Sequence, residues 1–294
     1  MRWENEKRSD NVEDRRGMSA SRGLVGGGIG TIVIVLVALF FGVDPSVLLQ
    51  GTGSPSVQQQ PAPQRPPAED RLASFVSVVL ADTEDTWREA FRRAGKTYRE
   101  PKLVLFTGAV QSACGFAQSA MGPFYCPADE KVYIDLGFYD ELRTRFKAPG
   151  DFAQAYVIAH EVGHHVQHLL GIAEQVRTAQ ERAGTTDRNR LQVRLELQAD
   201  CLAGIWGHHA NRVKKMVEDG DIEEALNAAS AIGDDRIQRQ TRGQIVPDAF
   251  THGTSEQRVR WFKRGIESGD ISQCNTFSVH LFLDGELSIF RRLR

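Results

Sequence analysis

Residues 160–164 read His-Glu-Val-Gly-His, with two histidines four positions apart. The surrounding pattern predicts a helix that starts at Asp151, whose side chain can cap it, and that stops at Gly171. Positions four residues apart lie on one face of a helix. His160 and His164 can therefore direct their imidazole nitrogens at a single metal ion.

Glu161 lies one position round the helix from His160, so it reaches a water molecule at the metal rather than the metal itself. Zinc lowers the pKa of a bound water to about 7, and a nearby carboxylate can take its proton as hydroxide attacks a peptide carbonyl. The motif therefore predicts one Zn²⁺ per chain, bound by His160 and His164, with Glu161 as the catalytic base.

A catalytic zinc also needs a third protein ligand and one open position. His168 lies two turns, roughly 11–12 Å, from His160, so these two cannot share an ion with the second histidine of the motif. His165 points about 100° away from that histidine and is expected to pack in the core. A metzincin would require glycine and histidine where this chain has Gln167 and Leu170, which excludes that class.

The third ligand is expected from a second helix, over residues 187–210, which contains Glu-Leu-Gln-Ala-Asp at 196–200. Glu196 and Asp200 share a face of this otherwise apolar helix, where a carboxylate is costly unless it is paired or binds metal. We therefore expect Glu196 to bind zinc and Asp200 to accept the outer N–H of a ligating imidazole. Gly163 costs about 1 kcal/mol relative to alanine inside a helix, and close approach of the second helix would offset that cost.

Composition bounds the class of protein. The chain has 294 residues, of which 41% are hydrophobic and 25% charged, with a formal net charge of −2. These values are ordinary for a folded protein, and they give no electrostatic reason to expect nucleic acid as a partner.

An apolar segment near the N-terminus predicts contact with a lipid bilayer. Residues 24–43 carry no charge, and twenty helical residues cover roughly 30 Å, the thickness of the hydrocarbon core. A cleaved signal peptide would have a shorter apolar stretch followed by a small-residue cleavage site, which is not found here. The segment is therefore expected to be a single transmembrane helix.

Basic residues flank this segment on one side only. Those before it are Arg2, Lys7, Arg8, Arg15, Arg16 and Arg22, and the next one is Arg65. Segments rich in Lys and Arg beside a membrane span usually lie in the cytoplasm. Residues 1–23 are therefore expected inside, and the chain after the span outside, the bacterial cytoplasmic membrane. Residues 44–68 are rich in proline and glutamine and are expected to form a linker, followed by one domain over residues 69–294.

Four cysteines follow the apolar segment, and an even number in an oxidising compartment favours pairing. Three connectivities are possible. Proximity favours Cys114 with Cys126, which leaves Cys201 with Cys274.

Further helices are expected over residues 71–94, 221–231 and 255–267, and strands over residues 102–106 and 131–136. Many helices, few strands and no regular alternation between them indicate an α+β fold.

The sequence HEVGHH at 160–165, followed by ELQADC at 196–201, resembles the bacterial putative neutral zinc metallopeptidases of the YpfJ type. The resemblance covers the whole chain, from the basic N-terminus and apolar segment to the domain with its HEVGHH and ELQADCLAG motifs. It implies a zincin-like fold with a glutamate as third ligand, as in gluzincins. It also implies that strand 131–136 is the sheet edge along which a peptide substrate lies.

Residues 251–258, Thr-His-Gly-Thr-Ser-Glu-Gln-Arg, are similar to a segment of membrane-embedded gluzincins in which a histidine steadies the oxyanion. The similarity implies that role for His252, with Arg258 as a supporting group. Gly253 replaces a proline of that segment, and a helix-capping turn at Thr254 or Ser255 is the alternative explanation.

The function expected from these features is a membrane-anchored, zinc-dependent endopeptidase that acts on polypeptides. Two alternatives stay open. One is a membrane-tethered, non-catalytic metal-binding or chaperone-like module, which would need a fourth protein ligand in a closed site. The other is a zinc hydrolase that acts on a non-peptide amide with the same catalytic residues.

Overall fold

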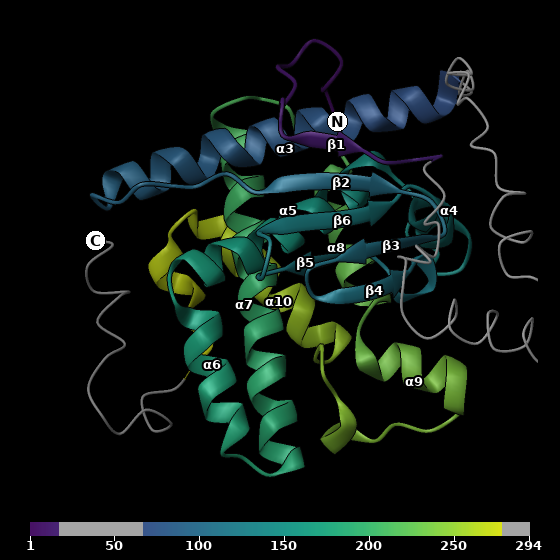
Figure 1. The fold of residues 1–294 in the computed structure, drawn as a ribbon, viewed down its shortest axis with the longest axis vertical. Coiled ribbons are helices and arrows are strands. Elements are labelled where there is room, and N and C mark those ends of the chain that lie inside the picture. Colours follow the sequence, from purple (N-terminus) through teal and green to yellow (C-terminus); the bar gives the residue numbers. More distant parts are fainter. Residues whose placement is uncertain (18–66, 278–294) are drawn as a thin grey trace, which may run out of the picture. The chain divides into compact units, whose positions relative to one another are not determined.

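Four strands form the main sheet of the computed structural model, which describes residues 1–17 and 67–277 (Figure 1). Their order across the sheet is β1 (Val12–Asp14), β2 (Lys102–Phe106), β6 (Lys131–Asp135) and β5 (Phe124–Cys126). The first three are parallel, and β5 is antiparallel to β6. Within the described residues β5 is therefore an edge strand. The expectation that strand 131–136 forms the edge is wrong, because β6 has a partner on each side.

The sheet lies between two apolar clusters, one on each of its faces. Side chains alternate between the faces of a strand, so Leu103 and Leu105 of β2 join the main core while Val104 and Phe106 point to the other side. There a hairpin of β3 (Ala109–Ser112) and β4 (Gly115–Gln118) contributes Val110 and Ala117 to the smaller cluster.

The structure describes eight α-helices, and all except α9 contribute side chains to the main core. They are α3 (Pro67–Arg93), α4 (Gly137–Thr144), α5 (Asp151–Leu169), α6 (Ile172–Glu181), α7 (Thr185–Arg212), α8 (Asp221–Ala231), α9 (Asp234–Arg242) and α10 (Ser255–Ser268). Three short 3₁₀ segments are η1 (Ser119–Met121), η2 (Pro247–Ala249) and η3 (Ile271–Cys274). The predominance of helices, with a small mixed sheet, agrees with the predicted α+β class.

Helices α5 and α7 pack closely at Gly163. A Cβ atom at Gly163 would lie 3.1 Å from the carbonyl oxygen of Ala199 and 3.2 Å from its Cα. The expectation that this glycine admits the backbone of the second helix is confirmed.

The start of α5 differs from the prediction. Gly150 is its N-cap and provides no side chain, while the carboxylate of Asp151 lies 3.1 Å from the α-ammonium of Met1. The N–H of Phe152 donates to Glu224 of α8 at 3.1 Å. The expected cap by Asp151 is thus wrong, and α8 supplies an acceptor for one of the exposed N–H groups of this helix end.

Residues 1–17 belong to the same unit as the domain. Trp3 is buried and its ring contacts Phe75 edge-on, with 5.3 Å between the centroids. Val12 pairs with Leu103 where β1 joins the sheet. The predicted boundary is therefore corrected, because these residues are part of the domain and not a separate N-terminal segment.

The predicted membrane span, residues 24–43, lies outside the described residues, as does all but the end of the predicted linker. Among the residues that are described, no helix is both long enough and apolar enough to cross a bilayer.

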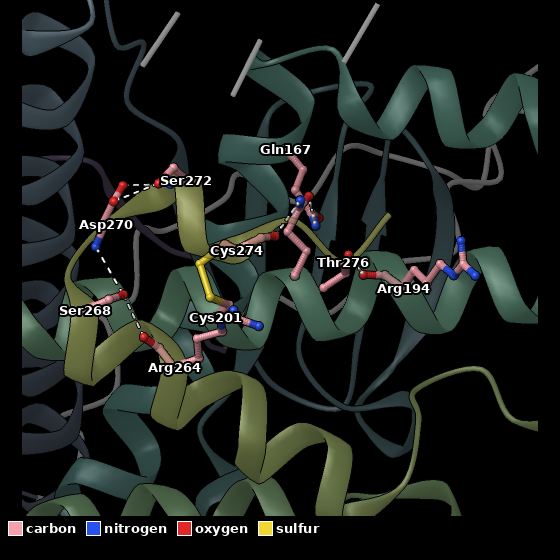
Figure 2. Close-up of a disulfide and its surroundings, with 10 residues drawn as sticks. Gln167, Arg194, Cys201, Arg264, Ser268, Asp270, Ser272, Cys274 and Thr276 are labelled. Atoms are coloured by element: carbon pink, nitrogen blue, oxygen red, sulfur yellow. Dashed lines mark hydrogen bonds between the residues drawn. A yellow bond between two sulfur atoms is a disulfide. The ribbon is translucent and has the colours of Figure 1, made fainter. Parts of the chain in front are cut away.

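Both expected disulfides are present. Cys114 is bonded to Cys126, which joins the β3–β4 hairpin to β5, and Cys201 of α7 is bonded to Cys274 of η3 (Figure 2).

Candidate metal centre and active site

A cavity of about 530 Å³ opens between α5, α7, β5 and the loop before α10. Its polar lining includes His160, Glu161, His164, Glu196 and His252. The structure therefore brings the predicted ligands, the predicted base and the predicted oxyanion donor to one cavity.

Three of these side chains converge. The Nε2 atom of His160 lies 3.2 Å, and that of His164 3.6 Å, from Oε2 of Glu196. One ligand atom from each residue can be chosen so that all three lie within 4.8 Å of one another.

This group fits a zinc ion. Zinc in catalytic sites is commonly bound by two imidazoles and a carboxylate. Four ligands held at about 2.0–2.2 Å in a tetrahedron are roughly 3.3–3.6 Å apart, close to the two separations found here. His160 and Glu196 are 7% and 6% exposed, which keeps these donors from competing water.

The outer nitrogen of His160 is held by a buried charged cluster. Its Nδ1 atom lies 2.9 Å from Oδ1 of Asp200, which is completely buried. Arg258 donates to both oxygens of Asp200, through Nε at 2.9 Å and Nη2 at 2.8 Å, and Tyr156 donates to Oδ1 at 2.5 Å. The expected contact of Asp200 with the outer nitrogen of an imidazole is thus found at His160, and the binding of metal by that imidazole stays a prediction. Tyr156 was not identified from the sequence.

Electrostatics favour the ionised form of both carboxylates. Burial raises the pKa of Asp200, but the charge of Arg258 and the hydrogen bond with His160 leave it below its usual value. Burial also raises the pKa of Glu196, but His164 and His160 hold it well below the usual range. Burial lowers the pKa of His160, whereas Asp200 and Glu196 raise it to about 9. In the absence of metal the site therefore binds protons, which a zinc ion would have to displace.

The outer nitrogen of His164 has a different partner. Its Nδ1 atom lies 2.9 Å from Oε1 of Gln167, whose side chain is fully buried. Gln167 also stands where a metzincin would have glycine. The spacing of three residues on one helix could have indicated the contact.

His252 lines the cavity from the loop that precedes α10. Its side chain is 51% exposed, and Nδ1 lies 3.2 Å from Oδ1 of Asp234. The other oxygen of Asp234 accepts the backbone N–H groups of Thr251, His252 and Gly253. Thr254 forms a capping box with Gln257, so the capping turn considered for this motif is present. The part of His252 in catalysis stays a prediction.

His165 is a packing residue, as expected. It is buried, and its Nε2 lies 2.6 Å from the carbonyl oxygen of Arg99 while Nδ1 lies 2.9 Å from the hydroxyl of Tyr125. Burial lowers the pKa of His165 to about 4. The contact ties edge strand β5 to the helix that carries the motif, a connection not identified from the sequence.

Comparison with known proteins places these residues in a family. A family model described as "putative neutral zinc metallopeptidase" matches residues 1–277. The uncharacterized protein YpfJ of Escherichia coli (strain K12) is 56% identical over 286 residues, which cover 94% of this chain and 99% of the relative. The uncharacterized protein Rv2575 of Mycobacterium tuberculosis (strain ATCC 25618 / H37Rv) is 43% identical over 215 residues, 69% of this chain and 71% of that protein. No solved structure matches the chain.

Proposed function

Because the chain belongs to the putative neutral zinc metallopeptidase family, we propose that it is a zinc-dependent endopeptidase with one catalytic zinc site. The observation that carries the proposal is the convergence of His160, His164 and Glu196 beside Glu161 in one cavity. Three protein ligands leave a tetrahedral ion one position for water or substrate.

The residues around this site then have distinct tasks. A zinc ion held there would polarise the scissile carbonyl and lower the pKa of a water molecule to about 7. Glu161 accepts the proton of the attacking water and passes it to the leaving nitrogen. Asp200 holds the ring of His160 in place, and Arg258 keeps Asp200 ionised. His252 is proposed to donate a hydrogen bond to the oxyanion from the loop side of the cavity.

Edge strand β5 offers a place for the substrate backbone. A polypeptide in extended conformation can pair with the outer edge of β5, next to Tyr125. Apolar groups of Phe124, Phe138 and Leu195 line the same cavity, which favours apolar side chains near the scissile bond. We therefore propose unfolded or extended polypeptide as the substrate class.

The test is proteolysis of an unstructured protein such as casein by the purified full chain. Glu161→Gln should abolish cleavage while the zinc content stays stoichiometric, because that residue is not a ligand. Glu174→Gln, an exposed carboxylate on α6, is the matched control and should retain full activity. Cleavage that persists in Glu161→Gln, or after removal of metal by a chelator, would overturn the proposal.

We further propose that residues 24–43 attach the chain to the cytoplasmic membrane, with the active site outside. Two disulfides in the domain support an oxidising compartment. Residues 1–17 pack within the domain, which supports a change in the expected side of the membrane for the N-terminus. We propose that residues 1–17 lie on the same side of the membrane as the active site. This replaces the expected arrangement, in which the N-terminus is inside and the domain outside.

Two exposed positions test this arrangement in cells with a permeabilised outer membrane. Arg8→Cys reports on the N-terminal residues and Lys263→Cys on α10. Both should react with a maleimide that cannot cross the inner membrane. Labelling of Lys263→Cys alone would contradict this proposal and support a chain that crosses the membrane once, with its N-terminus inside. Protection of both positions would place the domain in the cytoplasm.

A further inference from the structure

A series of hydrogen bonds leads from His164 to the Cys201–Cys274 disulfide. Nδ1 of His164 lies 2.9 Å from Oε1 of Gln167, and Nε2 of Gln167 donates to Oε1 of Gln198 at 3.0 Å. Nε2 of Gln198 in turn donates to the carbonyl oxygen of Cys274 at 3.0 Å. The series therefore connects a predicted zinc ligand on α5, through α7, to the segment that follows α10.

The chemistry of the last acceptor fixes the direction of every bond in this series. A main-chain carbonyl can only accept, so Gln198 must present its NH₂ group to Cys274 and its oxygen to Gln167. Gln167 also donates to the carbonyl oxygen of Leu195 at 2.7 Å, which occupies its second N–H. The oxygen of Gln167 is thus the atom turned toward His164, and the imidazole must donate through Nδ1.

This direction matters because a neutral imidazole carries one proton. With that proton on Nδ1, the Nε2 atom of His164 keeps its lone pair and faces Glu196 at 3.6 Å. The side chains of Gln167 and Gln198 are both completely buried, so bulk water has little access to replace either amide. The orientation of His164 therefore depends on two neutral amides, whereas that of His160 depends on the charged Asp200 cluster.

The disulfide holds the terminal acceptor. The carbonyl of Cys274 belongs to η3, and the bond to Cys201 fixes η3 to α7 one turn from Gln198. A second contact nearby, from Thr276 to the carbonyl oxygen of Arg194 at 2.6 Å, lies further along the same helix.

We propose that Gln167 and Gln198 are positioning residues for His164, and that the Cys201–Cys274 disulfide strengthens metal binding because it holds in place the carbonyl group to which Gln198 donates. The proposal rests on the metal site proposed above, but its readout is metal binding and not cleavage. Loss of the acceptor for a ligating histidine typically weakens metal binding about 10–100-fold.

The first experiment measures the dissociation constant for Zn²⁺ by competition with a chromophoric chelator. Gln167→Leu should raise it by roughly 10–100-fold, and Gln198→Leu should raise it by a smaller factor, because Leu195 still accepts from Gln167. Thr83→Val is the matched control, because it removes another buried hydrogen bond, to the carbonyl oxygen of Leu80, on α3. It should lower the melting temperature without changing zinc affinity.

A second readout reports the tautomer directly. At a pH at which the imidazole is neutral, long-range ¹⁵N–¹H spectra of metal-free, histidine-labelled protein should show His164 protonated at Nδ1 in the wild type and a mixture of tautomers in Gln167→Leu. Gln167→Glu keeps an acceptor opposite Nδ1 and should retain the wild-type tautomer. An unchanged tautomer in Gln167→Leu would overturn the directional argument.

The two disulfides provide an internal comparison. The double variant Cys201→Ala/Cys274→Ala should raise the zinc dissociation constant, while Cys114→Ala/Cys126→Ala should leave it within about twofold of the wild type. Equal weakening by both would overturn the role of this disulfide. A wild-type chain that binds no zinc would overturn the proposed function, whereas tight wild-type binding with unchanged variants would overturn this inference alone.

Discussion

Substitution of Gly163 by alanine has two opposite effects on the free energy of unfolding, a gain in helix propensity and a loss from overpacking. Alanine is favoured over glycine inside a helix by about 1 kcal/mol, so an unhindered site would gain stability. Here the new Cβ would lie 3.1 Å from the oxygen and 3.2 Å from the Cα of Ala199. Both are backbone atoms of α7, so the helices must separate by a few tenths of an ångström. Overpacking of this kind typically costs about 1–3 kcal/mol.

The expected net change in the free energy of unfolding is therefore between zero and a loss of about 2 kcal/mol. Zinc affinity should be affected more. Displacement of α7 carries Glu196 away from both histidines, and zinc sites tolerate errors of only about 0.2 Å in ligand distance. We expect the zinc dissociation constant of Gly163→Ala to rise at least tenfold, on the scale of other changes in ligand support.

The assay pairs urea unfolding of the metal-free protein with chelator competition. Gly207→Ala is the matched control. Gly207 lies inside α7, and a Cβ there would meet side chains and no backbone atom, Ile266 at 3.1 Å and Phe152 at 3.7 Å. The Ile266 side chain can rotate, so the control should be neutral or slightly stabilised with unchanged zinc affinity. If Gly163→Ala is instead stabilised by about 1 kcal/mol and binds zinc like the wild type, the helix spacing does not set the site.

Three further predictions concern charge and packing. Burial raises the pKa of Asp82 to about 6, although Trp206 donates to it at 2.7 Å. This pKa lies above that of Asp82 in the unfolded chain. The stabilisation from protonated Asp82 is therefore complete below about pH 4 and is lost as the pH rises through about 6. In urea unfolding of the metal-free protein, Asp82→Asn should remove up to about 3 kcal/mol of this pH dependence. Trp3→Ala should lower the free energy of unfolding by about 3–5 kcal/mol if residues 1–17 are part of the core, and a change below about 0.5 kcal/mol would contradict that packing. Asp200→Asn leaves the buried guanidinium of Arg258 without its carboxylate. The free energy of unfolding should fall by about 3–5 kcal/mol, and zinc binding should weaken in competition assays. Wild-type stability and affinity in this variant would contradict the proposed role of the cluster.

Local chemistry made one part of the site predictable. The spacing of His160 and His164, and that of Glu196 and Asp200, depends only on the pitch of a helix, which every helix shares. Gly163 was interpretable for a similar reason, because a glycine inside a helix has a known cost and close packing is a common cause. The longer helices and strand β2 were predicted for the same reason, since their patterns are carried by consecutive residues.

The remainder depends on contacts between distant parts of the chain. Strand β1 has three residues and no periodic signal, so its place beside β2 could not be inferred from residues 12–14. The basic residues before residue 24 give a topological signal, but they carry no information about the burial of Trp3 among them. The position of β5 at the edge similarly depends on its pairing with β6 and not on its own sequence.

The arrangement of α7 also explains why spacing between two helices has such weight here. This helix supplies Glu196 as a ligand, Asp200 as the partner of one histidine and Gln198 as the support for the other. Ala199, which meets Gly163, lies between them. One helix contact therefore sets the distance of all three groups from α5 at once. Small changes at that contact should affect both histidines together, whereas changes in Gln198 or Asp200 should affect one histidine each.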